Sequence, residues 1–178
     1  MKPGIVVIAE IAGAVATRVH EVQQQFDSRM AGELPPHLTL IGSSGMGPIS
    51  VRTDPETLRE ALLPATQSLA PMTLYFEPPM RFMQSDVVVL PLDPNGPVRT
   101  LHEELAERVR AAKIVAERPR FTFTPHVTLS LYRELPPREL RELLAMRFEE
   151  PVRVEAVQAY RATGPVGTER LFSLPLVG

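Results

Sequence analysis

PHLTL at residues 36–40 and PHVTL at residues 125–129 are near copies of each other. They stand 89 residues apart, which is half the length of the 178-residue chain. Each copy comes at the end of the same predicted succession of strand, helix and loop. A motif repeated at half the chain length within the same order of elements predicts a duplicated fold with a pseudo-twofold axis.

The segments around the two motifs alternate between strand and helix patterns. Residues 4–11 are apolar and β-branched, which predicts a buried strand, and residues 13–27 carry apolar side chains at helical spacing. Residues 86–92 predict another strand, and the turn at 94–97 starts another helix. The other predicted elements are a helix that begins at Asp54 and Pro55, a helix at 138–146, and strands at 37–41, 72–76, 126–131, 152–160 and 171–176. This order predicts an α+β fold with an antiparallel or mixed sheet.

The composition restricts the chemistry that the chain can perform. It has no Cys, which excludes thiolate zinc sites, redox dithiols and thiol nucleophiles. With 19 Lys and Arg against 21 Asp and Glu, the net charge is -2, which argues against broad binding of duplex nucleic acid. His, carboxylate, hydroxyl and Arg side chains remain as the chemically active groups.

We expect a cytoplasmic monomer without a membrane segment. Residues 4–16 superficially resemble the core of a signal peptide, but Glu10 places a charge within the apolar run. No other stretch approaches the ~18 apolar residues of a membrane-spanning helix.

Strand geometry brings a histidine and a hydroxyl to one face of each motif. Side chains alternate along a strand, so His37 and Thr39 point to one face and Leu38 points to the other. His126 and Thr128 follow the same rule. The two β-carbons of each pair are roughly 6.5 Å apart at ~3.3 Å per residue, so both side chains can reach one tetrahedral anion.

Two such strands brought together would present two imidazoles and two hydroxyls on one face. Imidazoles with a pKa near neutrality can serve as base and acid in one turnover, because one takes a proton from the nucleophile and the other gives one to the leaving oxygen. The hydroxyls can donate hydrogen bonds to nonbridging phosphoryl oxygens. This set of groups predicts phosphodiester cleavage without a metal.

The paired motifs resemble the two signature motifs of the 2H phosphoesterase superfamily, the group of 2′-5′ RNA ligases and 2′,3′-cyclic phosphodiesterases. The resemblance covers nearly the whole chain, including the FTFTPH stretch that leads into the second motif. It implies that His37 and His126 are the acid/base pair and that Thr39 and Thr128 bind phosphate. It also implies a single bilobal domain over residues 1–178, in which the antiparallel sheets of two pseudosymmetric lobes face a central cleft and helices lie outside.

The resemblance implies an enzyme that needs neither a cofactor nor a metal. Such an enzyme would hydrolyse the 2′,3′-cyclic phosphate of an RNA 3′ end or of a nucleotide to a 2′-phosphate. The same geometry in reverse would join a 2′,3′-cyclic phosphate to a 5′-hydroxyl, which is 2′-5′ ligation. Because the motifs are near copies, the residues themselves do not assign acid and base, and family usage puts the acid in the first motif.

Five further residues are candidates for substrate contact. Ser130 lies on the same strand face as the second hydroxyl, and Tyr132 follows that strand. Many members of the superfamily carry a basic residue just after the second motif, and the nearest one here, Arg133, has a strand parity that points away from the motif face. Arg120 beside an aromatic residue, and Phe82 beside an arginine, suit phosphate contact and base stacking in RNA.

Two other interpretations stay open at this stage. The histidines could bind a metal ion, although two histidines without a Cys or a carboxylate in the motif make a poor site. The chain could also be a non-catalytic module that binds RNA ends or nucleotides by capturing phosphate. A bell-shaped pH profile with turnover in EDTA separates catalysis from binding.

Overall fold

The secondary structure follows the predicted alternation of strands and helices. The computed structural model describes residues 3–82, 85–164 and 167–178. The elements are, in chain order, β1 (Gly4–Glu10), α1 (Ala14–Phe26), α2 (Ser28–Ala31), β2 (His37–Ile41), α3 (Pro55–Ser68), β3 (Met72–Leu74), β4 (Met80–Arg81), β5 (Val88–Pro91), α4 (Pro97–Ala111), β6 (His126–Ser130), α5 (Pro137–Ala145), β7 (Val152–Val154), β8 (Ala156–Ala162) and β9 (Thr168–Pro175).

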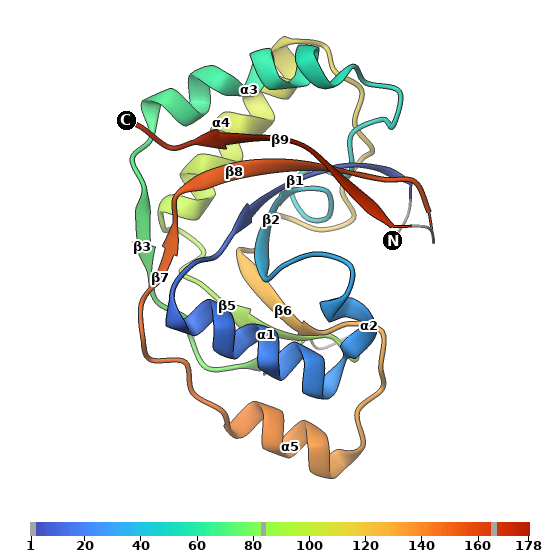
Figure 1. Ribbon diagram of the computed structural model, residues 1–178, viewed down its shortest axis with the longest axis vertical. Helices are drawn as coiled ribbons and strands as arrows, with labels where there is room; N and C mark the ends of the chain where they lie inside the picture. The colour runs from blue at the N-terminus through green and yellow to red at the C-terminus, as the bar shows by residue number, and fades with distance from the viewer. Residues whose placement is uncertain (1–2, 83–84, 165–166) are drawn as a thin grey trace.

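Seven of these strands form one sheet through the middle of the described molecule. Their order is β4-β5-β6-β2-β1-β8-β9, and β3 pairs with β7 in a separate two-stranded sheet. The strand pairs between these elements are antiparallel. In Figure 1, α3 lies above the strands β8 and β9, α4 runs behind them, and α1 and α5 lie below. The α+β class with antiparallel sheets, predicted from the sequence, is confirmed.

The two halves of the chain repeat the same local pairing. β1 pairs with β2 as β5 pairs with β6, and both ladders shift register at the same place, just after the threonine of the motif. The matching pairs are Ile8–Thr39 with Val89–Thr128, Ala9–Leu38 with Leu90–Val127, and Glu10–His37 with Pro91–His126. A pseudo-twofold axis between β2 and β6 therefore relates the two motif strands.

Each half of the chain supplies a helix to the motif strand of the other half. α1 follows β1 but packs against β6, and α4 follows β5 but packs against β2. Gln23 on α1 donates its side-chain amide to the carbonyl oxygen of Thr128 (2.8 Å). His102 on α4 donates Nδ1–H to the carbonyl oxygen of Leu40 (2.7 Å), since a carbonyl can only accept. This exchange ties both motif strands to the same core.

The structure departs from the sequence prediction where the chain changes sheets. The pattern predicts one strand over residues 152–160, but the chain breaks at Glu155, whose carbonyl oxygen accepts a hydrogen bond from the amide of Leu176 (2.9 Å). β7 on one side of the break joins β3, and β8 on the other side joins β1. The short elements α2 and β4 are not predicted by the sequence pattern. Within the described residues, no helix is long and apolar enough to cross a membrane.

Candidate active site

The two motif strands lie side by side at the centre of the large sheet. Leu38 of β2 is paired with Val127 of β6 in the antiparallel sense. Both side chains are at most 1% exposed and point into the core beneath the helices. Because side chains alternate along each strand, the residues on either side of this pair point to the opposite face of the sheet.

That opposite face carries both histidines and both threonines of the motifs. An antiparallel register around the central pair sets His37 across from Thr128 and Thr39 across from His126. All four side chains are half-buried. The two histidines are diagonal neighbours, and residues in such a pair lie about 7–8 Å apart, with their β-carbons somewhat closer. This spacing leaves room for a tetrahedral phosphate between the two rings.

The backbone fixes the tautomer of both imidazoles in the same way. Nδ1 of His37 lies 2.7 Å from the carbonyl oxygen of Pro35, and Nδ1 of His126 lies 2.7 Å from that of Thr124. Since a carbonyl oxygen can only accept, each Nδ1 carries the hydrogen and each neutral ring has an unprotonated Nε2. That nitrogen can take a proton, and it can return one from the charged ring.

Burial lowers the pKa of both imidazoles below the ordinary value. For His126, burial is the largest cause, and the hydrogen bond to Thr124 acts in the opposite direction. For His37, burial again dominates over the hydrogen bond to Pro35, while the charge of His126 lowers the pKa and that of Glu10 raises it. Both rings are therefore mostly neutral near pH 7 in the free protein.

The two histidines differ in their neighbours on the outer strands. Glu10 lies directly across from His37, whereas the equivalent position next to His126 is Pro91. The hydroxyl of Tyr160 donates to the carboxylate of Glu10 (2.6 Å), and burial, followed by this bond, raises the pKa of Tyr160 to about 12. Only His37 thus has a carboxylate across from it in its own sheet ladder.

The structure places three of the other candidate residues close to the second motif. The ring of Phe82 contacts that of His126 edge-to-face, with centroids 5.2 Å apart. Ser130 is fully buried, and its hydroxyl has no hydrogen-bond partner among the described residues. The ring of Tyr132 lies 4.1 Å from the guanidinium of Arg29, and its hydroxyl donates to Glu33 (2.7 Å). Of these three, only Phe82 contacts a motif histidine.

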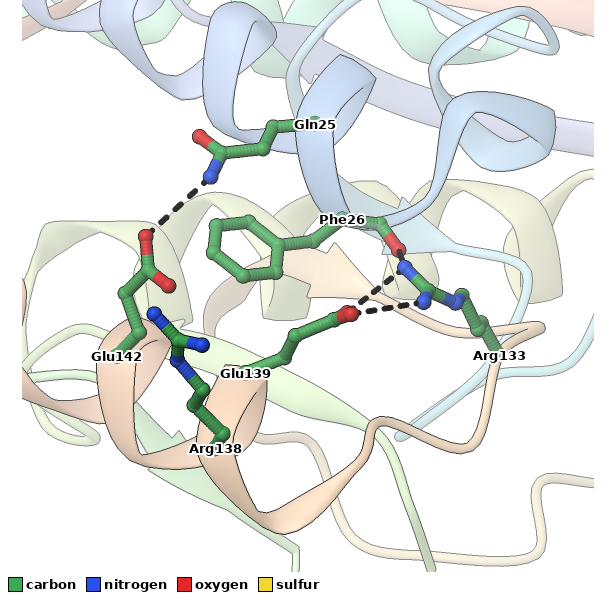
Figure 2. Close-up of a pocket in the computed structure, with 6 residues that line it drawn as sticks. All are labelled: Gln25, Phe26, Arg133, Arg138, Glu139 and Glu142. Atoms are coloured by element: carbon green, nitrogen blue, oxygen red, sulfur yellow. Dashed lines mark hydrogen bonds and ion pairs between the residues drawn. The ribbon is translucent and has the colours of Figure 1, made fainter.

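Arg133 lies away from the motif face. Figure 2 shows its guanidinium paired with the carboxylate of Glu139 on α5, at 2.8 Å, while it also donates to the carbonyl oxygen of Phe26 (3.3 Å). This group lines a hollow of about 300 Å³ between α1 and α5. The other lining residues are Gln25, Arg138 and Glu142.

Arg120 lies in a different hollow, beside α4. The hollow has a volume of about 450 Å³, and neither motif histidine lines it. Its lining residues are Gly45, Arg99, His102, Glu103 and residues 119–123. Within the described residues, no group of three or more His, Asp or Glu side chains is arranged to bind a metal ion.

Two carboxylates beside the motifs were not among the site residues predicted from the sequence. One is Glu10, whose position at the end of an apolar strand was a visible signal. The other is Asp27, a buried carboxylate that accepts hydrogen bonds from the amides of Leu131 (2.8 Å) and Tyr132 (2.7 Å) directly after β6. It also accepts from the amide of Met30 (3.2 Å) and so caps α2. Asp27 fixes the path by which the chain leaves the second motif strand.

The repeated α+β fold with paired motif strands defines the class of protein, which is the 2H phosphoesterases. Residues 11–165 match the family model described as the 2′-5′ RNA ligase superfamily. The chain belongs to this superfamily. Membership implies an enzyme that acts on phosphodiester bonds.

Solved structures with the same fold extend over nearly the whole chain. The crystal structure of TT0787 from Thermus thermophilus is 20% identical, covers 98% of each chain and has a TM-score of 0.67. A structure described as a phosphoesterase is 15% identical, covers 99% of this chain and 100% of its own, and has a TM-score of 0.60. Escherichia coli LigT complexed with 3′-AMP is 17% identical, covers 99% of each chain and has a TM-score of 0.56. At these identities the likeness shows the fold, and no curated protein matches the chain in sequence.

Proposed function

We propose that the chain is a metal-independent phosphodiesterase that hydrolyses the 2′,3′-cyclic phosphate of RNA 3′ ends or nucleotides to a 2′-phosphate. The pairing of β2 with β6 carries this proposal, because it brings two imidazoles and two hydroxyls to one patch of the sheet. LigT, a protein with the same fold, has been crystallised with 3′-AMP, with ATP and with NADP+, which supports a nucleotide as the kind of ligand.

The unequal surroundings of the two histidines suggest which is the acid. The carboxylate of Glu10 stabilises a protonated His37, and a protonated imidazole is the general acid. His126 has an aromatic ring and a proline as neighbours instead, which favours the neutral ring that a general base requires. We therefore assign His37 as the acid and His126 as the base.

The reaction then follows from these roles. Nε2 of His126 takes a proton from water while the water oxygen forms a bond to phosphorus. The bond from phosphorus to the ribose 3′-oxygen breaks, and Nε2–H of His37 protonates the departing oxygen. The hydroxyls of Thr39 and Thr128 donate to the nonbridging oxygens as negative charge builds up on them. With a 5′-hydroxyl in place of water as the nucleophile, the same steps form a 2′-5′ linkage.

A single reaction tests the proposal. The protein is incubated with a 2′,3′-cyclic mononucleotide in EDTA, and the position of the phosphate in the product is read by ³¹P NMR. We expect a 2′-phosphate, and we expect His37→Ala and His126→Ala each to lower kcat by about 10² to 10⁴. His20→Ala is the control, because His20 lies on α1 and contacts Gln24 rather than the motif face.

Three results would contradict the proposal. One is a 3′-phosphate product, which would mean that the 2′-oxygen leaves. Another is turnover of both motif variants at the parent rate. The last is saturable binding of the nucleotide by the parent protein without any turnover, which is the behaviour of a non-catalytic module.

A further inference from the structure

The hollow beside α4 has a lining that suits single-stranded RNA. It has a volume of about 450 Å³ and lies between the first turns of α4, the turn at Gly45 and residues 119–123. The motif face, which carries both histidines and both threonines of the motifs, includes none of these residues. The chemistry of this lining therefore needs an explanation of its own.

Two guanidinium groups line the hollow against one carboxylate. Arg120 is exposed, and it has no hydrogen-bond or ion-pair partner among the described residues. Arg99 is held in place, since it donates to the carbonyl oxygen of Phe123 (3.0 Å) and pairs with Glu103 at 3.6 Å. The carboxylate of Glu103 is thus already paired with Arg99, and the guanidinium of Arg120 remains available to bind a phosphate.

An exposed aromatic ring stands beside these cations. Phe121 is 70% exposed, the largest exposed fraction among the large hydrophobic side chains of the described residues. Its backbone is fixed nevertheless, because its carbonyl oxygen accepts a hydrogen bond from the amide of Gly45 (2.9 Å). A ring presented on an anchored backbone is a ready surface for a stacked base.

The hollow is close along the chain to the motif face. His126 comes five positions after Phe121, so their α-carbons are at most about 17–18 Å apart. Thr124 links the two places: its carbonyl oxygen holds the His126 ring, and its amide donates to the hydroxyl of Ser44 (3.3 Å). The two places are therefore no farther apart than a few nucleotides of single-stranded RNA can span.

We propose that this hollow is a second subsite that binds the body of a single-stranded RNA, with Phe121 stacked on a base and Arg120 contacting a backbone phosphate. This inference rests on the proposed function and narrows its substrate from nucleotides in general to RNA chains. A mononucleotide held at the motif face is too short to gain these contacts, whereas an oligonucleotide gains them fully.

The test compares two substrates. One is a 2′,3′-cyclic mononucleotide, and the other is an unstructured eight-residue RNA that ends in the same cyclic phosphate. For Phe121→Ala we expect kcat/KM for the oligonucleotide, relative to kcat/KM for the mononucleotide, to fall about 5- to 100-fold through a higher KM, as loss of one stacked base predicts. For Arg120→Gln we expect a similar loss and a salt dependence of RNA binding that is weaker by about one phosphate contact.

A matched control and a second measurement distinguish failure of the subsite from failure of the proposed function. Tyr75→Ala removes another exposed aromatic ring, 63% exposed and outside the hollow, and should leave the substrate ratio unchanged. Binding of the RNA is also measured directly, by fluorescence anisotropy. If the parent does not hydrolyse either substrate, the proposed function fails, and weaker binding by Phe121→Ala still supports the subsite. If the parent hydrolyses both and Phe121→Ala changes neither ratio nor affinity, the subsite is wrong and the proposed function stands.

Discussion

Two imidazoles that are near copies in sequence occupy unequal surroundings. Each is oriented by a carbonyl two residues earlier in the chain, at the same distance of 2.7 Å. The difference comes from their neighbours: Glu10 on β1 lies beside one ring, and Pro91 on β5 and Phe82, directly after β4, lie beside the other. A duplicated site can therefore divide acid and base roles without any change in the motifs themselves.

The pH dependence of kcat/KM should reflect the lowered pKa of both histidines. The base must be neutral, so activity is lost as the pH falls through its pKa, and the acid must be protonated, so activity is lost as the pH rises through its pKa. Burial places both values below 6.5 in the free protein. We expect kcat/KM for a cyclic mononucleotide to peak on the acid side of pH 6.5. A maximum above pH 7.5 would contradict this assignment.

Replacing Glu10 by Gln should move one limb of that profile. The substitution removes the negative charge that raises the pKa of His37 and keeps a similar shape beside Tyr160. We expect the alkaline limb to move to lower pH while the acid limb stays in place, so kcat/KM at pH 7 should fall severalfold. Glu169→Gln is the control, since that exposed carboxylate on β9 pairs with Arg161. Movement of the acid limb instead would mean that His37 is the base.

The sequence predicts which way the four motif side chains point, because side chains alternate between the two faces of a strand. This rule, applied once to each motif, is enough for His37, Thr39, His126 and Thr128. Their neighbours need a different kind of information. The place of Glu10 depends on the register between β1 and β2, and register is set by the folded sheet.

At the scale of single elements, the turn after β2 is the tightest point near the site. Gly45 has φ of +72°, and a β-carbon there would overlap Nε2 of His102 and lie 2.8 Å from the β-carbon of Phe123. The rings of these two residues are stacked with centroids 3.8 Å apart, so neither can move independently. The glycine-rich segment 42–47 thus serves to pack the turn against α4.

Gly45→Ala should therefore be markedly destabilising. We expect the free energy of unfolding to fall by about 2–4 kcal/mol, from the overlap with His102 and from the left-handed backbone. Gly32→Ala is the control: φ is -85°, the nearest atoms to its β-carbon are 3.6 Å away, and it should be neutral or stabilising by about 0.4–1 kcal/mol. Urea unfolding measures both. Equal midpoints for the two variants would show that the turn tolerates a side chain.

Long periodic elements are predictable from the sequence, whereas sheet changes and very short elements are not. The helices α1, α3 and α4 and the strands of the motifs follow the predicted segments because each buries one regular face. The break at Glu155 has no comparable signal, because β7 and β8 carry similar side chains and differ only in their partners. β4 spans two residues, too few for any periodicity.

At the scale of the whole molecule, the exchange of helices makes each half depend on the other. α1 holds the strand of the second motif and α4 holds the strand of the first. Most buried hydrophobic residues of both halves belong to one cluster that runs from Ile5 to Leu176, and a small second cluster of four residues lies around Ile8. If one half unfolded alone, the motif strand and the helix of the other half would both lose their packing partners and become exposed.

Residues 1–178 should therefore unfold as a single cooperative unit, as one domain requires. Leu129→Ala removes a fully buried side chain on β6, in the second half, and should cost about 2–5 kcal/mol. We expect hydrogen exchange to report the same loss of protection at the amides of β2 and β6, and calorimetric and van't Hoff enthalpies to agree. Val177→Ala, which changes a side chain that is 62% exposed, should leave both measurements unaltered. A loss confined to β5 and β6 would show two units that fold separately, and the shared core would then not be what holds the two histidines together.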